Sequence, residues 1–328
     1  MHGTRWRFWA TTVLGLAGIA FLYVTLGSDG IATTLANVDP VFLLFGFLSY
    51  AFFFIIRGIR WRLLLRDIAP DATVADTTSL SAAGWLVSTF IPMKAGDITR
   101  TALVARRTKA SMVGVAGSVA LERALDLIGL ALFSSLSLLI FAVFLNHGLP
   151  AGVAQGVAFA WALPLAGVMT VLLVARLIKD PDPKQRWKRF IQRFARAADE
   201  LRKTPKRLPI LAILTALTSF AQISLFLFLI HAVAPELPMT VIAAGVPLFL
   251  LSFVVSITPA NIGTYEASFV AVFTLLGLDP VALLPAGVAL HILTASIVTV
   301  LGTIGFLQFR FSNPEPPTPV PAAVQVPP

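Results

Sequence analysis

The sequence predicts an all-α protein embedded in a membrane, and three observations support this: its composition, the length of its apolar runs and the placement of its cations. Of 328 residues, 57% are hydrophobic and 12% are charged, whereas soluble domains have roughly 45–50% and about 25%. The mean hydropathy is +0.86. The apolar residues form unbroken runs and lack the period of about 3.6 or 2 that is typical of a soluble core. We therefore expect a polytopic integral membrane bundle.

Six apolar segments are long enough to cross a hydrocarbon core of about 30 Å, which takes about 20 residues. They lie near 8–26, 41–60, 127–145, 155–177, 209–233 and 281–308. Two further segments, 79–121 and 240–278, are apolar but interrupted, the first over 92–109 and the second over 259–263. We expect each of these two to form a broken or re-entrant hairpin.

The cations lie on one side of this arrangement. No Lys or Arg occurs in the connections near 27–40, 146–154, 234–239 and 278–281. Lysines and arginines gather instead over 57–66, 94–109 and 176–207. Because cytoplasmic loops carry the excess of Lys and Arg, we expect a multi-pass protein of the bacterial inner membrane. Both termini are then cytoplasmic.

The chain divides into two membrane halves, 1–147 and 148–310, and each reads as span, span, broken hairpin, span. The first half begins inside and the second begins outside, so the halves have inverted topology. Residues 184–203 predict a basic amphipathic helix, which either lies on the leaflet and attracts anionic lipid heads or serves as a loop helix that satisfies the positive-inside rule. Residues 311–328 predict a disordered, proline-rich tail.

The two breaks share a short pattern. Pro92-x-x-x-Gly96 occurs in the first and Pro259-x-x-x-Gly263 in the second. Paired segments interrupted by Gly and Pro, at matching places in two inverted halves, indicate a transporter site near the membrane midplane. Backbone amides that follow Gly96 and Gly263 are expected to be free, which makes them a natural place for an anionic phosphate.

Charged residues within the apolar segments are the candidates for binding a lipid headgroup, because each costs about 2.5–3.5 kcal/mol near a helix centre. Glu122 and Asp126 share a helix face, and Arg123 can bridge to Asp126. This cluster either neutralises itself at a membrane boundary or engages a phosphate through Arg123. The complete candidate set is Lys94, Asp97, Arg100, Glu122, Arg123, Asp126, Asn261, Tyr265 and Glu266.

Glu266 has no cation near it in the sequence. We expect its partner to be Arg100, Arg123 or Lys94, and stabilisation by a helix N-terminus is the alternative. Other polar residues are expected to have structural roles. Interfacial anchors are predicted at the end of the second span, at Arg57, Arg60, Trp61, Arg62 and Arg66. Gln222 and His291 are predicted to form hydrogen bonds between helices.

Several functions are not expected. The chain has no cysteine and four histidines, which are widely spaced, so neither a thiolate nucleophile nor a metal centre is predicted. We find no catalytic motif and expect no cofactor. The net charge of +9 follows the membrane topology, so it does not indicate nucleic acid.

Four motifs in order carry a resemblance to a known family. They are Arg60-Trp61-x-x-Leu64-Leu65, Ile91-Pro92-Met93-Lys94-Ala95-Gly96-Asp97-x-x-Arg100, Glu122-Arg123-x-x-Asp126 and Pro259-x-x-Ile262-Gly263-x-x-Glu266. With this hydropathy, the chain resembles the flippase-like membrane domain of bacterial lysylphosphatidylglycerol synthases over about 10–308. The family more usually has Arg and Glu around the first glycine, where this chain has Lys94 and Asp97.

The resemblance implies that the protein moves an anionic or aminoacylated phospholipid, or a related lipid, between leaflets. Its partners are then membrane lipids. The alternative that it implies is a membrane component of a lipid-modifying system, acting as the partner of a lipid-synthesis enzyme or as a remnant transferase. Bifunctional family members carry a soluble aminoacyl-transferring domain after the membrane domain. Since only the proline-rich tail follows Arg310 here, the transferase reaction is not expected of this chain.

Overall fold

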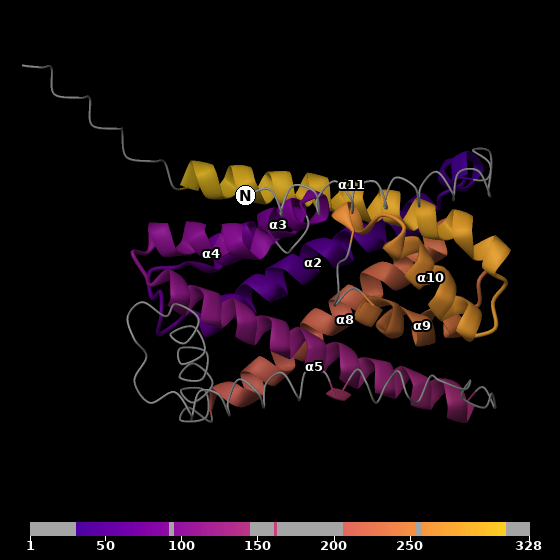
Figure 1. Ribbon diagram of the computed structural model, residues 1–328, viewed down its shortest axis with the longest axis horizontal. Helices are drawn as coiled ribbons and strands as arrows, with labels where there is room; N and C mark the ends of the chain where they lie inside the picture. The colour runs from indigo at the N-terminus through magenta and orange to yellow at the C-terminus, as the bar shows by residue number, and fades with distance from the viewer. Residues whose placement is uncertain (1–30, 92–94, 145–160, 163–205, 253–257, 313–328) are drawn as a thin grey trace, which may run out of the picture.

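The computed structural model describes residues 31–91, 95–144, 161–162, 206–252 and 258–312 (Figure 1). All regular elements in these ranges are helices, and four of them are long and apolar enough to cross a membrane. These are α2 (Pro40–Leu64), α5 (Met112–Phe144), α8 (Arg207–Val233) and α11 (Pro280–Ser312). They confirm the polytopic all-α class. The predicted spans 8–26 and 155–177 and the predicted helix 184–203 lie outside the described residues.

Polar side chains define where the first helices begin. The carboxylate of Asp39 accepts a hydrogen bond at 2.8 Å from the amide of Val41 at the start of α2. Helix α3 (Val74–Phe90) starts with a capping box, in which Thr73 and Asp76 each accept a hydrogen bond from the other's backbone amide. Such caps satisfy amides that the helix itself leaves unpaired.

Two helical hairpins complete the bundle. Helices α3 and α4 (Ala95–Arg107) form the first, and α9 (Met239–Ser252) and α10 (Thr264–Leu275) form the second. The legs have 17, 13, 14 and 12 residues, fewer than the about 20 that a full span takes.

The break in the second hairpin lies where the sequence predicts it. It contains the short 3₁₀ helix η1 (Pro259–Asn261). Ala260, Asn261 and Gly263 have φ angles of 53°, 56° and 78°, in the left-handed region that an α-helix of L-residues does not use.

The first break is shorter than the predicted 92–109. Helix α4 occupies 95–107, and Lys109, with φ of 53°, lies in the turn that leads to α5. Helix α5 begins at Met112, well before the expected 127, so residues 122–126 lie inside one continuous helix. Ion pairs with charged side chains of α2 and α4 let this helix continue through residues 122–126. The helix of α11 also includes residues 311–312 of the predicted tail.

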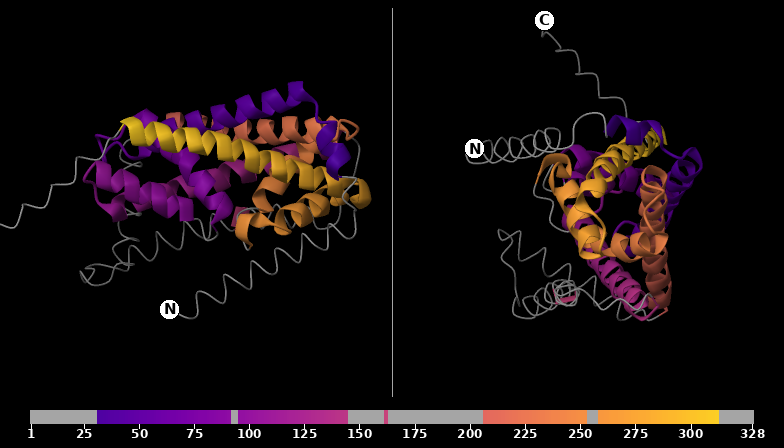
Figure 2. Two further views of the ribbon diagram at one scale, coloured as in Figure 1. Left: turned by 90° about the horizontal axis from the view of Figure 1, so that it is seen from above. Right: turned by 90° about the vertical axis from the view of Figure 1, so that its right-hand side faces the viewer.

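The helices run roughly along one common axis and interleave the two halves of the chain (Figures 1 and 2). Helix α2 packs on α8, and α3 packs on α11 just as α9 packs on α5. Helix α4 contacts α5 just as α10 contacts α11. Each of these contacts has a counterpart with the halves exchanged; the inverted topology of the halves stays a prediction.

Small residues let the helices approach closely at two places. A Cβ atom added at Gly305 of α11 would lie 2.6 Å from the carbonyl oxygen of Ser79 in α3. One added at Gly96 of α4 would collide with the carbonyl group of Gly84 in α3. Close backbone approach at glycine is typical of helix packing in membranes. These two close approaches hold α3 against α4 and α11. The C-terminal end of α3 lines the same cavity as the break at η1.

Candidate functional site

Seven charged side chains from three helices pair with one another inside the bundle. They are Arg57 and Arg60 from α2, Asp97 and Arg100 from α4, and Glu122, Arg123 and Asp126 from α5. We call this set the arginine–carboxylate network. Pairing offsets the cost of removing these charges from water, and it requires all three helices to hold their relative positions.

Glu122 is fully buried and lies at the centre of the network. Its Oε2 atom accepts a hydrogen bond of 3.0 Å from Arg100 Nη1, and its Oε1 atom forms an ion pair with Arg57. Arg57 Nη1 also donates to Asp126 Oδ2 at 2.9 Å, and Arg60 pairs with the other oxygen of Asp126.

The prediction that Arg57 and Arg60 are interfacial anchors was wrong. Their side chains are 1% and 0% exposed. The two arginines are one turn apart on α2, so they share a face, and that face meets the carboxylates of α5.

Arg123 is the most exposed member of the network. Its Nε and Nη2 atoms donate to the two oxygens of Asp97 at 2.9 and 2.8 Å. Its third nitrogen, Nη1, is 3.6 Å from Asp126 Oδ2, beyond hydrogen-bond distance. The Arg123 side chain is 29% exposed, more than any other member of the network. One edge of its guanidinium group is therefore available to a ligand.

The network carries one more positive charge than negative. Four guanidinium groups pair with three carboxylates. Aromatic rings face part of this charge, since Arg100 lies over the ring of Trp61 at 4.5 Å and Arg57 over that of Trp85 at 5.9 Å. An excess charge inside a membrane bundle favours an anionic ligand, which would neutralise it.

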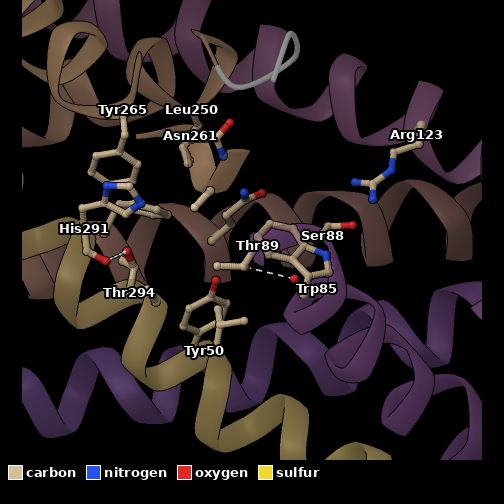
Figure 3. Close-up of a pocket in the computed structure, with 15 residues that line it drawn as sticks. Tyr50, Trp85, Ser88, Thr89, Arg123, Leu250, Asn261, Tyr265, His291 and Thr294 are labelled. Carbon is tan, nitrogen blue, oxygen red and sulfur yellow. Dashed lines mark hydrogen bonds between the residues drawn. The ribbon is translucent and has the colours of Figure 1, made fainter. Parts of the chain in front are cut away.

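A cavity of about 170 Å³ adjoins Arg123, where the end of α3 meets the break in the second hairpin. It is lined by Tyr50, Trp85, Ser88, Thr89, Arg123, Gln222, Phe226, Leu250, Ala260, Asn261, Tyr265, His291, Thr294, Ala295 and Val298. In Figure 3, Arg123 lies at one end and Tyr265 and His291 lie at the other, with Trp85 and Asn261 between them. The cavity is thus shared by both halves of the chain.

Glu266 lies behind this far end. Its Oε2 atom accepts a hydrogen bond of 2.8 Å from the amide of Gly263, and its Oε1 atom lies 2.7 Å from His291 Nδ1. The His291 ring stacks on Tyr265 with 4.2 Å between centroids and 11° between planes. The expectation that Arg100 or Arg123 pairs with Glu266 was wrong, because those arginines are engaged in the network while α11 packs directly on α10. The alternative, a place at a helix N-terminus, is confirmed, since Glu266 lies in the first turn of α10 and binds the amide of Gly263. Lys94, the third predicted partner, lies outside the described residues.

The structure brings most of the predicted residues to this region. Asp97, Arg100, Glu122, Arg123 and Asp126 belong to the network, and Arg123, Asn261 and Tyr265 line the cavity. Lys94 and Pro92 lie outside the described residues.

The two break glycines use their own amides within the protein. The amide of Gly96 donates to Ser88 Oγ at 3.1 Å, and that of Gly263 donates to Glu266. Binding of a phosphate by the amides that follow them stays a prediction. Arg123 is the charged side chain in the described lining of the cavity.

Sequence reasoning missed several residues of the region. Arg57 and Arg60 belong to the network, and Tyr50, Trp85, Gln222 and His291 line the cavity. The hydrogen bond between helices that was predicted for His291 is confirmed by its contact with Glu266 of α10. A usable signal existed for the two arginines, for Gln222 and for His291: ionisable or amide side chains within a span are rare and usually face the bundle interior. The aromatic residues carry no such signal, because Tyr and Trp are common in apolar helices.

These features define a multi-pass α-helical membrane protein with a cavity that is lined by both broken hairpins and the neighbouring long helices, beside a buried charge network. The model of one family, the lysylphosphatidylglycerol synthase TM region, matches residues 8–302. The chain belongs to this family, which confirms the resemblance seen in the sequence and links the protein to lipid modification. Comparison with curated proteins gives no significant match.

Proposed function

We propose that this protein is a lipid translocase, which moves an anionic or aminoacylated phospholipid, or a related lipid, between the leaflets of the bacterial inner membrane. The observation that carries the proposal is the cavity at the junction of the two hairpins, with Arg123 and the excess positive charge of the network at one end. A lipid headgroup needs such a polar, charge-matched site in order to cross the hydrocarbon core.

Arg123 has a suitable geometry for holding the phosphate. Asp97 occupies two of its nitrogens and fixes the plane of the guanidinium group, while Nη1 remains for a phosphate oxygen. A charge-assisted hydrogen bond of this kind is roughly twice as strong as a neutral one. Apolar residues such as Phe226, Leu250 and Val298 form other parts of the lining, and they suit the start of the acyl chains.

The hairpins supply the moving parts in this proposal. The second hairpin is interrupted beside the cavity by three residues with positive φ angles, Ala260, Asn261 and Gly263. The matching contacts of the two halves support two related states, in which one half rocks against the other and exposes the cavity to each leaflet in turn.

Leaflet exchange of a fluorescent phosphatidylglycerol in proteoliposomes tests the proposal. We expect Arg123→Gln to lower the exchange rate at least about tenfold, the equivalent of about 1.4 kcal/mol. The matched control is Arg62→Gln, since Arg62 lies outside the cavity and donates to the backbone oxygen of Pro70. Equal rates for wild type and Arg123→Gln, with both proteins folded, would remove Arg123 from the mechanism. Exchange no faster than in protein-free vesicles would refute the translocase.

The family assignment favours a second candidate function, the membrane component of a lipid-modifying system. In this role the protein would present a lipid to a lipid-synthesis enzyme. Affinity purification from the native membrane, followed by an aminoacyl-transfer assay on the co-purified proteins, distinguishes the two functions. Transfer activity that depends on the protein, without leaflet exchange, would favour the second.

A further inference from the structure

The cavity lining beyond Arg123 includes several neutral polar side chains but no carboxylate among the described residues. Tyr50 and Tyr265 contribute phenol groups, Gln222 and Asn261 contribute amides, and Trp85 contributes an indole N–H. These groups both donate and accept hydrogen bonds. The indole nitrogen of Trp85 is buried and has no hydrogen-bond partner within the part of the chain that the structure describes.

Every described carboxylate near the cavity is already engaged. Asp97, Glu122 and Asp126 each pair with two or more arginines, and Glu266 has one oxygen on the Gly263 amide and the other on His291. The connecting segments 92–94 and 253–257 contain no Asp or Glu in their sequence. Among the described residues, an ammonium group in the cavity would therefore find no free carboxylate.

The charge balance works against a cationic headgroup. The network already has one positive charge in excess, and its exposed member, Arg123, faces the cavity. A phosphodiester neutralises this excess. An aminoacyl group would bring a second cation into the same low-dielectric space, where like charges repel strongly.

We infer that the cavity selects an anionic phosphodiester that carries an uncharged polyol, and that it discriminates against the aminoacylated form. The phosphate binds Arg123, and the hydroxyl groups of the polyol bind the neutral polar side chains, above all Gln222 and Asn261. This inference rests on the proposed function for its physiological meaning. The recognition itself is measured by binding, whether or not the lipid is moved.

Native mass spectrometry of the purified protein, with lipids of identical acyl chains in competition, tests the inference. The lipids are phosphatidylglycerol, lysylphosphatidylglycerol, phosphatidic acid and diacylglycerol. We expect phosphatidylglycerol to bind at least about tenfold more tightly than the lysyl form, and several-fold more tightly than phosphatidic acid, which lacks the polyol. A glycosylated polyprenyl phosphate carries the same polyol phosphate chemistry on another tail, and its competition with phosphatidylglycerol identifies the source of the ligand.

A substitution within the lining separates specific recognition from general attraction to anions. Gln222→Leu should lower the affinity for phosphatidylglycerol toward that for phosphatidic acid. The control Gln308→Leu removes an exposed amide of α11 that is not part of the cavity lining, and it should leave the preference intact.

The outcomes for recognition and for transport are distinct. Lysylphosphatidylglycerol that binds as tightly as phosphatidylglycerol, or more tightly, overturns the inference, and leaflet exchange measured in parallel still decides the translocase. Selective binding of phosphatidylglycerol without any exchange supports the inference and overturns the translocase. If no lipid binds more tightly than diacylglycerol, both the inferred selectivity and the proposed translocase are overturned.

Discussion

Replacing Glu122 by Gln should destabilise the whole bundle, because this carboxylate joins three helices. Glu122 is fully buried and pairs with Arg57 of α2 and Arg100 of α4. The amide has nearly the same shape, so the change removes charge without creating a cavity. The excess positive charge of the network would rise from one to two. Removing one partner of a buried ion pair costs about 3–5 kcal/mol, and we expect a cost in this range.

Thermal unfolding in detergent, followed by the intrinsic fluorescence of the six tryptophans, measures this effect. A cost of at least about 3 kcal/mol lowers the apparent Tm by at least about 6 °C. The matched control is Glu236→Gln, which neutralises an exposed glutamate between α8 and α9 and should change Tm little.

A second variant checks that the loss arises from charge imbalance. Arg100→Gln combined with Glu122→Gln removes one charge of each sign and restores the excess to one. The double variant should therefore be more stable than the sum of the single changes implies, with a coupling energy of about 0.5–3 kcal/mol. A Tm of Glu122→Gln equal to that of Glu236→Gln, or strictly additive single changes, would refute the reasoning.

Three further predictions concern the packing, the topology and the pH dependence. Gly96→Ala places a methyl group against a backbone carbonyl of α3 and should cost about 1–3 kcal/mol in the same unfolding assay; an unchanged Tm would contradict the close approach. Because the chain has no cysteine, single cysteines report topology: in intact cells an impermeant maleimide should label Glu236→Cys and not Arg66→Cys, and the reverse pattern would invert the orientation. Asp67 accepts a hydrogen bond from Arg207, which holds the pKa of this carboxyl below its usual range. Asp67→Asn should therefore lower stability by at most about 1 kcal/mol near neutral pH. The difference should vanish as the pH falls below about 3.9 and through the lowered pKa; a difference that grows with acidity would contradict it.

The sequence was sufficient to predict the helical class and the four long helices that the structure describes, because their apolar runs match the thickness of a membrane. It also located the break at 259–263, since proline and glycine there leave an α-helix no continuous hydrogen bonding. It misplaced the start of α5. A run that contains Glu122, Arg123 and Asp126 looks like a boundary until the arginines of the neighbouring helices are known.

The sequence predicted many residues of the candidate site, but it predicted less well which side chains pair with one another. Arg123, Asn261 and Tyr265 were identified because polar groups in interrupted apolar segments are costly unless they have a role. The partner of Glu266 was not identifiable, because it depends on the register of α10 against α11. The burial of Arg57 likewise depends on how α2 meets α5. Packing between segments distant in the chain decides both.

Photolabelling with a phosphatidylglycerol that carries a diazirine in its headgroup tests most directly whether the cavity is the headgroup site. After illumination of the protein in lipid vesicles, mass spectrometry of its peptides identifies the labelled residues. The account predicts labels at cavity positions such as Trp85, Asn261 and His291, and their loss in Arg123→Gln. Labels confined to outward-facing residues such as Phe45 and Phe220, which are 47% and 58% exposed, would contradict it.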